Sequence, residues 1–141
     1  MKMSTTKFEP FWEDKCWGRV QHIFADEHAA VSLLQVVAGW KCSRHSHNNR
    51  YNIFAVQEGA IVIEEWYAGQ TKTLTLLTPG ETLIVPPKVV HRFRIRQSGR
   101  FVEVYKPDPG KAVDRLDIVR LDIGGRDEGL DDELRAAGLL K

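Results

Sequence analysis

The sequence has few cysteines, no long apolar run and almost no net charge. Its two cysteines, Cys16 and Cys42, are far apart in the 141 residues and neither belongs to a CxxC pair, so a thiolate metal knuckle or a redox pair is not indicated. No uncharged apolar run approaches the ~20 residues of a membrane-spanning helix, and the first residues, MKMSTTKFEPFWEDK, lack the apolar segment of a signal peptide. These absences favour a cytoplasmic protein with reduced thiols.

The balance of charges argues against large anionic partners. Lysine and arginine number 20 and aspartate and glutamate number 19, which leaves a formal net charge of +1 at pH 7. Binding to a nucleic-acid backbone or to anionic lipid depends on an excess of positive charge. We therefore expect neither nucleic acid nor membrane as a partner, and a composition of 43% hydrophobic and 28% charged residues predicts an ordinary globular domain.

Short segments rich in β-branched and aromatic residues dominate the middle of the chain. They cover residues 30–37, 51–57, 60–66, 71–77, 82–85, 91–96 and 101–106. Turn-forming sequences separate them at residues 57–59, 68–70, 79–80 and 97–99. This spacing predicts an all-β fold, an antiparallel sandwich or barrel, as one domain over residues 16–106.

The two ends of the chain read differently from this domain. In the C-terminal extension, residues 107–141, Leu130, Leu134 and Ala137 recur at helical spacing after a run of acidic residues, which predicts a short helix. The N-terminal extension, residues 1–15, contributes Phe8, Phe11 and Trp12, and Trp17 follows it. We expect these aromatic residues to cover an edge of the sheet or to cross to a second copy, and therefore predict a homodimer.

Three of the five histidines are candidate metal ligands. His45 and His47 are two residues apart, so in an extended chain both side chains lie on one face. Alternation of apolar and polar residues over 91–96 places His91 on the interior face and three arginines on the other. Neutral imidazole is the commonest transition-metal ligand, so His45 and His47 can offer two ligands to one metal ion, and His91 is a third candidate ligand. The pair alone is weak evidence, because two histidines at this spacing also occur by chance. We expect the other two, His22 and His28, at the surface.

The residues around these histidines follow two fixed spacings. The first runs through Gly39, His45, His47, Asn52 and Gly59, and the second through Gly80, Pro86 and His91. They are the spacings of the two motifs of the cupin superfamily, which the chain resembles over residues 30–106. The resemblance implies a double-stranded β-helix, a small jelly-roll-like barrel, in which His45, His47 and His91 hold one divalent transition metal ion such as Zn, Mn, Fe, Ni or Co.

Two positions depart from the cupin pattern. Asn52 stands where the first motif usually carries a glutamate ligand. A neutral amide is a poorer metal ligand than a carboxylate, so we expect weaker metal retention and a stronger attraction for an anionic ligand, whether or not Asn52 coordinates. Lys88 stands where the second motif usually has glycine, which affects the turn and not the ligands. Histidines without metal would instead be hydrogen-bonded core residues, and this alternative stays open.

Segments at both ends of the predicted barrel resemble the cupin domain of type II mannose-6-phosphate isomerases. They are Cys-Trp-Gly at 16–18, Val-Glu-Val at 102–104, Asp-Ile-Val-Arg-Leu-Asp at 117–122 and Gly-Arg at 125–126. The nucleotidyltransferase domain that is often fused to such cupins is not in this sequence. The resemblance implies an isomerase-like domain that acts on, or binds, a small anionic carbohydrate.

An aldose–ketose isomerase needs a base, an electrophile at the carbonyl and a cationic contact for the phosphate. Glu103 and Glu64 are the candidate bases, although alternation sends one of Glu64 and Glu65 inward and the other outward. The candidate substrate contacts are Arg50, Lys88, Tyr51 and Tyr105. Two other functions stay open: a non-catalytic cupin that binds a small molecule, and a three-histidine iron dioxygenase.

Overall fold

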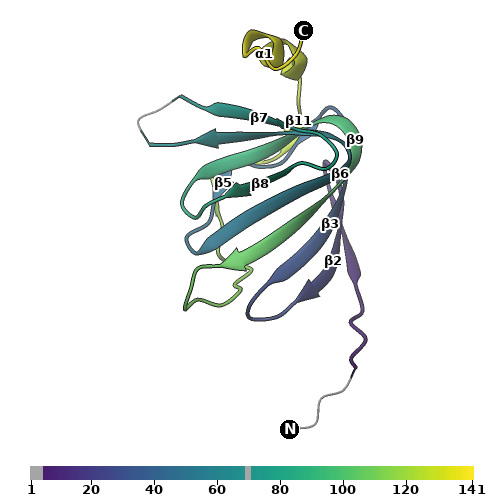
Figure 1. The fold of residues 1–141 in the computed structure, drawn as a ribbon, viewed down its shortest axis with the longest axis vertical. Coiled ribbons are helices and arrows are strands. Elements are labelled where there is room, and N and C mark those ends of the chain that lie inside the picture. Colours follow the sequence, from purple (N-terminus) through teal and green to yellow (C-terminus); the bar gives the residue numbers. More distant parts are fainter. Residues whose placement is uncertain (1–4, 69–70) are drawn as a thin grey trace.

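A computed structural model describes residues 5–68 and 71–141 (Figure 1). One antiparallel sheet of 11 strands curls on itself, and a short helix, α1, lies at one end of it (Figure 1). The elements are β1 Phe11–Lys15, β2 Gly18–Ala25, β3 Ala30–Val36, β4 Trp40–Lys41, β5 His45–Ser46, β6 Arg50–Trp66, β7 Thr73–Leu77, β8 Thr82–Val85, β9 Val90–Pro107, β10 Val119–Arg120, β11 Gly125–Arg126 and α1 Leu130–Ala136. The predicted all-β barrel-like fold with a C-terminal helix is confirmed. Among the described residues, no helix is long and apolar enough to span a membrane.

Two long strands, β6 and β9, form the centre of the sheet. They pair antiparallel along almost their whole length, from Arg50 opposite Pro107 to Trp66 opposite Val90. Strand β6 also pairs with β7 and β8, whereas β9 pairs with β3, β4 and β5. The two long strands therefore join the other strands into one curled sheet, and β9 connects the short strand β5 to the rest of the barrel.

The turns predicted at residues 57–59 and 97–99 are not present, and each predicted pair of strands is one continuous strand. The pairing register of β6 and β9 shifts between Val56 and Ile61. Gly59 has a φ of 82°, and a Cβ atom on Gly99 would lie 2.0 Å from the carbonyl oxygen of Glu58. These glycines let two backbones approach closely at a bulged bend instead of reversing the chain. The turn at 79–80 is confirmed, and the predicted turn at 68–70 includes residues outside the described ranges.

The inner face of the curled sheet encloses an apolar core. Phe93 packs edge-on against Trp17 and Phe101, with ring centroids 4.9 and 5.1 Å away. As the alternation predicted, His91, Phe93 and Ile95 are all buried. The remaining buried members of the cluster are Val20, Leu34, Val36, Cys42, Phe54, Val56, Ile61, Ile63, Leu77, Val85 and Val89. Burial of these side chains holds the strands that position the histidines.

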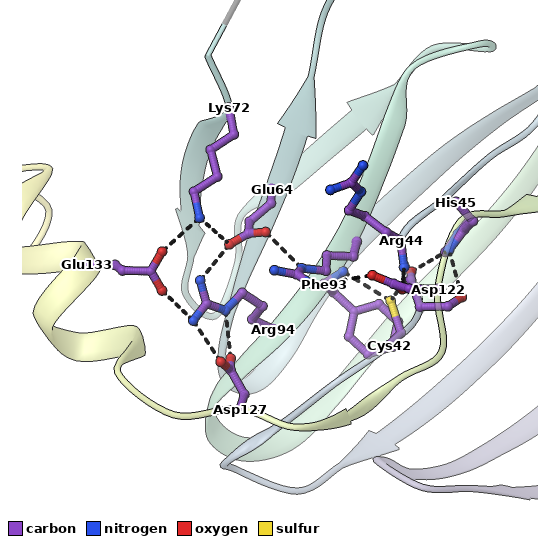
Figure 2. A network of polar contacts seen from close by, with 12 residues as sticks. Cys42, Arg44, His45, Glu64, Lys72, Phe93, Arg94, Asp122, Asp127 and Glu133 are labelled. Carbon is purple, nitrogen blue, oxygen red and sulfur yellow. Dashed lines mark hydrogen bonds and ion pairs between the residues drawn. The ribbon is translucent and has the colours of Figure 1, made fainter.

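The outer face of β6 and β9 is covered by the C-terminal part of the chain. Helix α1 packs Leu130 and Leu134 against Val62. Beside this contact, Arg94 donates to Glu64 at 2.5 Å and to both carboxylate oxygens of Asp127 at 2.7 Å (Figure 2). Arg92, Arg94 and Arg96 of β9 were predicted on this face, but the carboxylates that cover them were not.

Helix α1 contributes a further carboxylate to this ion-pair cluster. Arg94 lies 2.6 Å from Glu133 of the helix, and Lys72 bridges Glu133 and Glu64 at 2.7 and 3.3 Å (Figure 2). Burial alone lowers the pKa of Arg94, but its bonds to Asp127, Glu133 and Glu64 outweigh burial and raise it. Arg94 is therefore a fixed cation that anchors the C-terminal segment.

Between these anchors and β9, residues 117–127 form what we call the C-terminal strap. Its strand β10 pairs with β5, with Arg120 opposite His45, and its strand β11 pairs with β4. The backbone N–H of Arg44 also donates to Asp122 at 2.6 Å (Figure 2). The sheet thus extends beyond residues 16–106 at this end, and at the other end β1 pairs with β2.

Candidate metal centre

Three histidines from two distant segments meet inside the curled sheet. His45 lies in β5 and His47 just after it, while His91 lies at the start of β9. Pairing of β5 with β9 places His45 directly opposite His91. The ligand atoms of the three side chains lie within 4.8 Å of one another. The structure therefore brings all three predicted ligands to one place.

Backbone carbonyl groups fix the orientation of each imidazole ring. In every ring Nδ1 is within hydrogen-bond distance of a carbonyl oxygen, so Nδ1 carries the proton and donates it. Nε2 then carries the lone pair that binds a metal, and an outer hydrogen bond of this kind also raises the basicity of a ligand. The bonds are His45 to Ser43 at 2.7 Å, His47 to Asp117 at 2.6 Å and His91 to Val89 at 2.9 Å.

Burial keeps the three imidazoles neutral. It lowers the pKa of His45 to about 2, with the neighbouring His91 and His47 adding to the effect. It lowers the pKa of His47 to about 3, assisted by the charge of Arg50, and the pKa of His91 to about 4. Neutral imidazole is the form that coordinates transition metals. The donor set therefore fits a divalent transition metal ion held by these three residues.

Asn52 lies beside the histidines, but its oxygen is turned away from them. Its amide nitrogen is 3.0 Å from Nε2 of His91 and 3.4 Å from Nε2 of His47, and its oxygen accepts a hydrogen bond from Arg50. Asn52 is 2% exposed. In this orientation the amide donates to the rings and cannot act as a fourth oxygen ligand.

His45 and His47 line a cavity of about 630 Å³. Of the predicted substrate and catalytic residues, Arg50, Tyr105 and Glu103 line this cavity together with His45 and His47. Arg50 donates to Glu103, and its guanidinium group stacks 4.5 Å from the centre of the Tyr105 ring. A carboxylate, a guanidinium group and an aromatic ring thus lie on the wall next to the candidate ligands.

Two predicted substrate contacts do not line the cavity. Tyr51 neighbours Asn52 in β6 and therefore faces the other side of the sheet, where Lys106 lies 5.8 Å from its ring. Lys88 is exposed and has a φ of 69°. Its backbone N–H donates to the carbonyl oxygen of His47 at 2.6 Å. Lys88 therefore supports the turn in a left-handed conformation that glycine, the usual cupin residue, adopts without strain.

Glu64 lies on the face opposite the histidines. Its side chain is fully buried and bonds Arg94 at 2.5 Å and Arg92 at 2.8 Å. Burial alone raises the pKa of Glu64, but these two arginines outweigh burial and lower it. Glu65 is the inward residue of the pair, since it lies opposite His91. The structure therefore assigns Glu64 to the ion-pair cluster and does not bring it to the candidate metal centre.

Several cavity residues were not predicted from the sequence. Arg115 and Arg120 line the cavity and have no carboxylate partner among the residues that the structure describes. His22, expected at the surface, has a side chain only 23% exposed and lines the same cavity. Asp117 accepts from His47 through its carbonyl group, as described above, but it does not line the cavity. The segment 117–122 was noted only for its family resemblance, and the approach of His22, Arg115 and Arg120 to the cavity depends on how distant segments pair.

A curled antiparallel sheet with a histidine cluster facing a cavity is typical of the cupin-type barrel. The model of the AraC-like ligand-binding domain family matches residues 33–131, which is more than two thirds of the chain and includes the three histidines and the C-terminal strap. The chain belongs to this family. A comparison with curated proteins finds no match.

Solved structures of other cupins share the fold. Oxalate decarboxylase from Bacillus subtilis at pH 4.6 superposes with a TM-score of 0.72 at 12% identity, over 86% of this chain and 33% of that chain. KdgF from Halomonas sp. superposes with a TM-score of 0.59 at 17% identity, over 69% of this chain and 87% of that chain. A further Bacillus subtilis oxalate decarboxylase structure, from work on its Mn(II) centres, gives a TM-score of 0.69 at 11% identity, over 86% and 33%. This chain spans a third of the length of oxalate decarboxylase.

Proposed function

We propose that the protein binds a small anionic molecule in its cavity with a divalent transition metal ion held by His45, His47 and His91. The observation that supports this proposal is the set of three buried, neutral imidazoles whose Nδ1 atoms are all occupied by carbonyl groups. Their Nε2 lone pairs meet at one place, where the Asn52 amide reaches the rings of His47 and His91. A cation would satisfy all three lone pairs together, in place of the two contacts that the Asn52 amide makes with them.

The charge of the cavity favours an anionic ligand. Three neutral ligands leave the charge of a divalent ion uncompensated. Arg115 and Arg120 add positive charge to the wall, and among the described residues neither is neutralised by a carboxylate. Arg50 is already bonded to Glu103 and Asn52. We therefore propose Arg115 and Arg120, in place of Lys88, as the contacts for a phosphate or carboxylate group.

The more specific proposal is isomerisation of a sugar phosphate such as mannose 6-phosphate. The observation in its favour is that the Glu103 carboxylate lines the cavity that also holds the histidines. Glu103 would remove a proton from the carbon next to the carbonyl group and return it to the neighbouring carbon. Arg50 would keep the carboxylate oriented through its hydrogen bond. A bound metal ion would supply polarisation of the substrate carbonyl group.

Metal analysis of protein purified without a histidine tag tests the first proposal. Wild-type protein and His28→Ala, a control at an exposed histidine, should retain close to one divalent ion per chain after reconstitution. The double variant His45→Ala, His47→Ala should lose it. A wild-type protein that takes up no Mn, Fe, Co, Ni or Zn would contradict the metal centre, and ligand binding that survives chelation would favour a metal-independent binding protein.

Turnover separates the remaining functions. Protein loaded with each metal should interconvert mannose 6-phosphate and its ketose isomer, and Glu103→Gln should lower kcat at least about 100-fold, because general-base catalysis contributes that much. Absence of turnover on hexose and pentose phosphates would refute the isomerase proposal. Uptake of oxygen by ferrous protein with a small organic substrate would instead identify a three-histidine dioxygenase.

A homodimer and a cytoplasmic location complete the proposal. Strand β1 pairs only with β2 in the described part of the chain, and all five of its residues are exposed, Phe11 and Trp12 among them. An unpaired apolar edge is stabilised when a second copy covers it. A monomeric mass by light scattering at micromolar concentration would contradict the dimer. The free cysteines, Cys16 and Cys42, support a reducing compartment.

A further inference from the structure

A row of polar side chains crosses the inner face of the sheet from the candidate metal centre to the first strand. Asn52 accepts from Arg50, Arg50 donates to Glu103, and Glu103 lies opposite Ser32 in the pairing of β3 with β9. Ser32 Oγ is 3.4 Å from Nδ1 of His22, and Nε2 of His22 is 2.9 Å from a carboxylate oxygen of Glu13. The polar row consists of Glu13, His22, Ser32, Glu103, Arg50 and Asn52.

Strand alternation directs the far half of this row into the cavity. His22 and Ser32 lie two residues from Val20 and Leu34, which are buried core residues on the same face of β2 and β3. Glu13, His22 and Ser32 line the cavity that also contains His45 and His47. Apolar side chains form the wall beside them: Trp17, Val20, Leu34 and Phe93. Five members of the polar row, Glu13, His22, Ser32, Glu103 and Arg50, therefore line one cavity beside these apolar side chains.

The hydrogen bonds of the row determine what it can recognise. Glu13 is an acceptor only, so Nε2 of His22 donates to it, and Nδ1 of the same ring shares a hydrogen bond with the Ser32 hydroxyl group. The hydroxyl group of Ser32 can donate and accept, Glu103 is an acceptor, and Arg50 is a donor. A ligand hydroxyl group both donates and accepts, so a hydroxylated chain matches such an alternation, whereas a methylene chain would desolvate it without replacing its hydrogen bonds.

We infer that Glu13, His22 and Ser32 form a second subsite, which binds the hydroxylated part of a ligand whose anionic group lies at the metal centre. This inference rests on the proposed function, because the metal centre places the anionic group. The cavity volume of about 630 Å³ suits a ligand much larger than a two-carbon acid. The ligand class is therefore a polyhydroxylated carboxylic acid.

Three carboxylates of equal charge test the subsite on metal-loaded protein by titration calorimetry. Acetate reports the anionic group alone, hexanoate adds an apolar chain, and gluconate adds a hydroxylated chain of the same length. Gluconate should bind at least about 10-fold more tightly than either other acid, since each additional hydrogen bond contributes about 3- to 10-fold. Ser32→Ala and His22→Ala should each weaken gluconate binding about 3- to 10-fold and leave acetate binding unchanged. His28→Ala should change neither.

The outcomes separate this subsite from the metal proposal. If gluconate binds no more tightly than hexanoate, or if Ser32→Ala weakens acetate and gluconate equally, the subsite is refuted while acetate binding still supports the metal centre. If acetate fails to bind but gluconate binds and depends on Ser32 and His22, the subsite stands and the anionic contact at the metal is refuted. If none of the three acids binds, both proposals about the ligand are overturned, and metal content alone decides the metal centre.

Discussion

Outside the apolar core, replacement of Arg94 should lower the free energy of unfolding more than replacement of any other side chain. Arg94 is 3% exposed and holds two buried carboxylates from different parts of the chain, Glu64 of β6 and Asp127 beyond β11. Arg94→Met keeps the length of the side chain and removes its charge. Glu64 keeps the 2.8 Å bond to Arg92, but Asp127, 2% exposed, loses both of its side-chain hydrogen bonds in the described structure.

The magnitude follows from this unpaired carboxylate. Removing one partner of a buried ion pair costs about 3–5 kcal/mol, because the remaining charge stays desolvated without compensation. We expect Arg94→Met to lower the free energy of unfolding by about that amount at pH 7. A second change, Asp127→Asn in the Arg94→Met background, should restore part of the loss, since a buried neutral amide costs less than a buried charge.

Equilibrium unfolding in urea provides the measurement, with Arg96→Met as the matched control. Arg96 lies on the same strand and face as Arg94 and forms an ion pair with Asp131 at 3.0 Å, but the side chain of Asp131 is 47% exposed. An exposed pair contributes between about 0 and 1 kcal/mol, so the control should be nearly neutral. If Arg94→Met and Arg96→Met lower stability equally, or if Asp127→Asn makes the first variant less stable, burial of an unpaired charge is not the cause.

Three further predictions concern the metal centre and the C-terminal segment. Asp117→Ala should weaken metal binding about 10- to 100-fold in competition with a chromophoric chelator, because the Asp117 carboxylate fixes the strap whose carbonyl group orients His47; unchanged affinity would contradict this role. Lys88→Gly should raise stability by about 1 kcal/mol in thermal unfolding by relieving a positive φ. The bond to Arg94 lowers the pKa of Glu133 to about 2, so the ionised Glu133 stabilises the fold fully above pH 4.5 and no longer does so near pH 2. The difference in free energy of unfolding between the wild type and Glu133→Gln should therefore fall toward zero from pH 4.5 to pH 2. A difference that does not change with pH would contradict this contribution of Glu133.

Local patterns predicted the fold and the cluster of three histidines well. Alternation along β9 correctly placed His91 inside, because one side of a half-buried strand is decided by its own sequence. The family spacing correctly brought His45, His47 and His91 together. The predicted turn at 97–99 was wrong for a related reason: Gly99 marks a local bend, and a bulge inside β9 needs the same backbone freedom as a hairpin turn.

Patterns within one segment could not predict contacts between residues of distant segments. His22 lies in a polar stretch and was expected at the surface, yet pairing of β2 with β3 carries it into the cavity. Glu64 and Glu65 could not be assigned to faces without the register of β6 on β9. Two of the three carboxylates that contact Arg94, those of Asp127 and Glu133, come from the C-terminal segment, and only the folded path of the strap brings them there.

Strand β9 connects the candidate metal centre to the C-terminal segment through its two faces. Its inner face supplies His91, and its outer face supplies Arg94, which anchors Asp127 at the end of the strap. The strap then returns to the first motif, where the Asp117 carbonyl group accepts from His47 and the Asp117 carboxylate accepts from the next two backbone N–H groups. The strap contacts the segment that carries His47 directly. An ion that binds more tightly when this segment is held in place by the strap must therefore also stabilise the strap in its observed position. The Arg94→Met variant should therefore bind metal more weakly than Arg96→Met, although Arg94 lies on the face opposite the histidines.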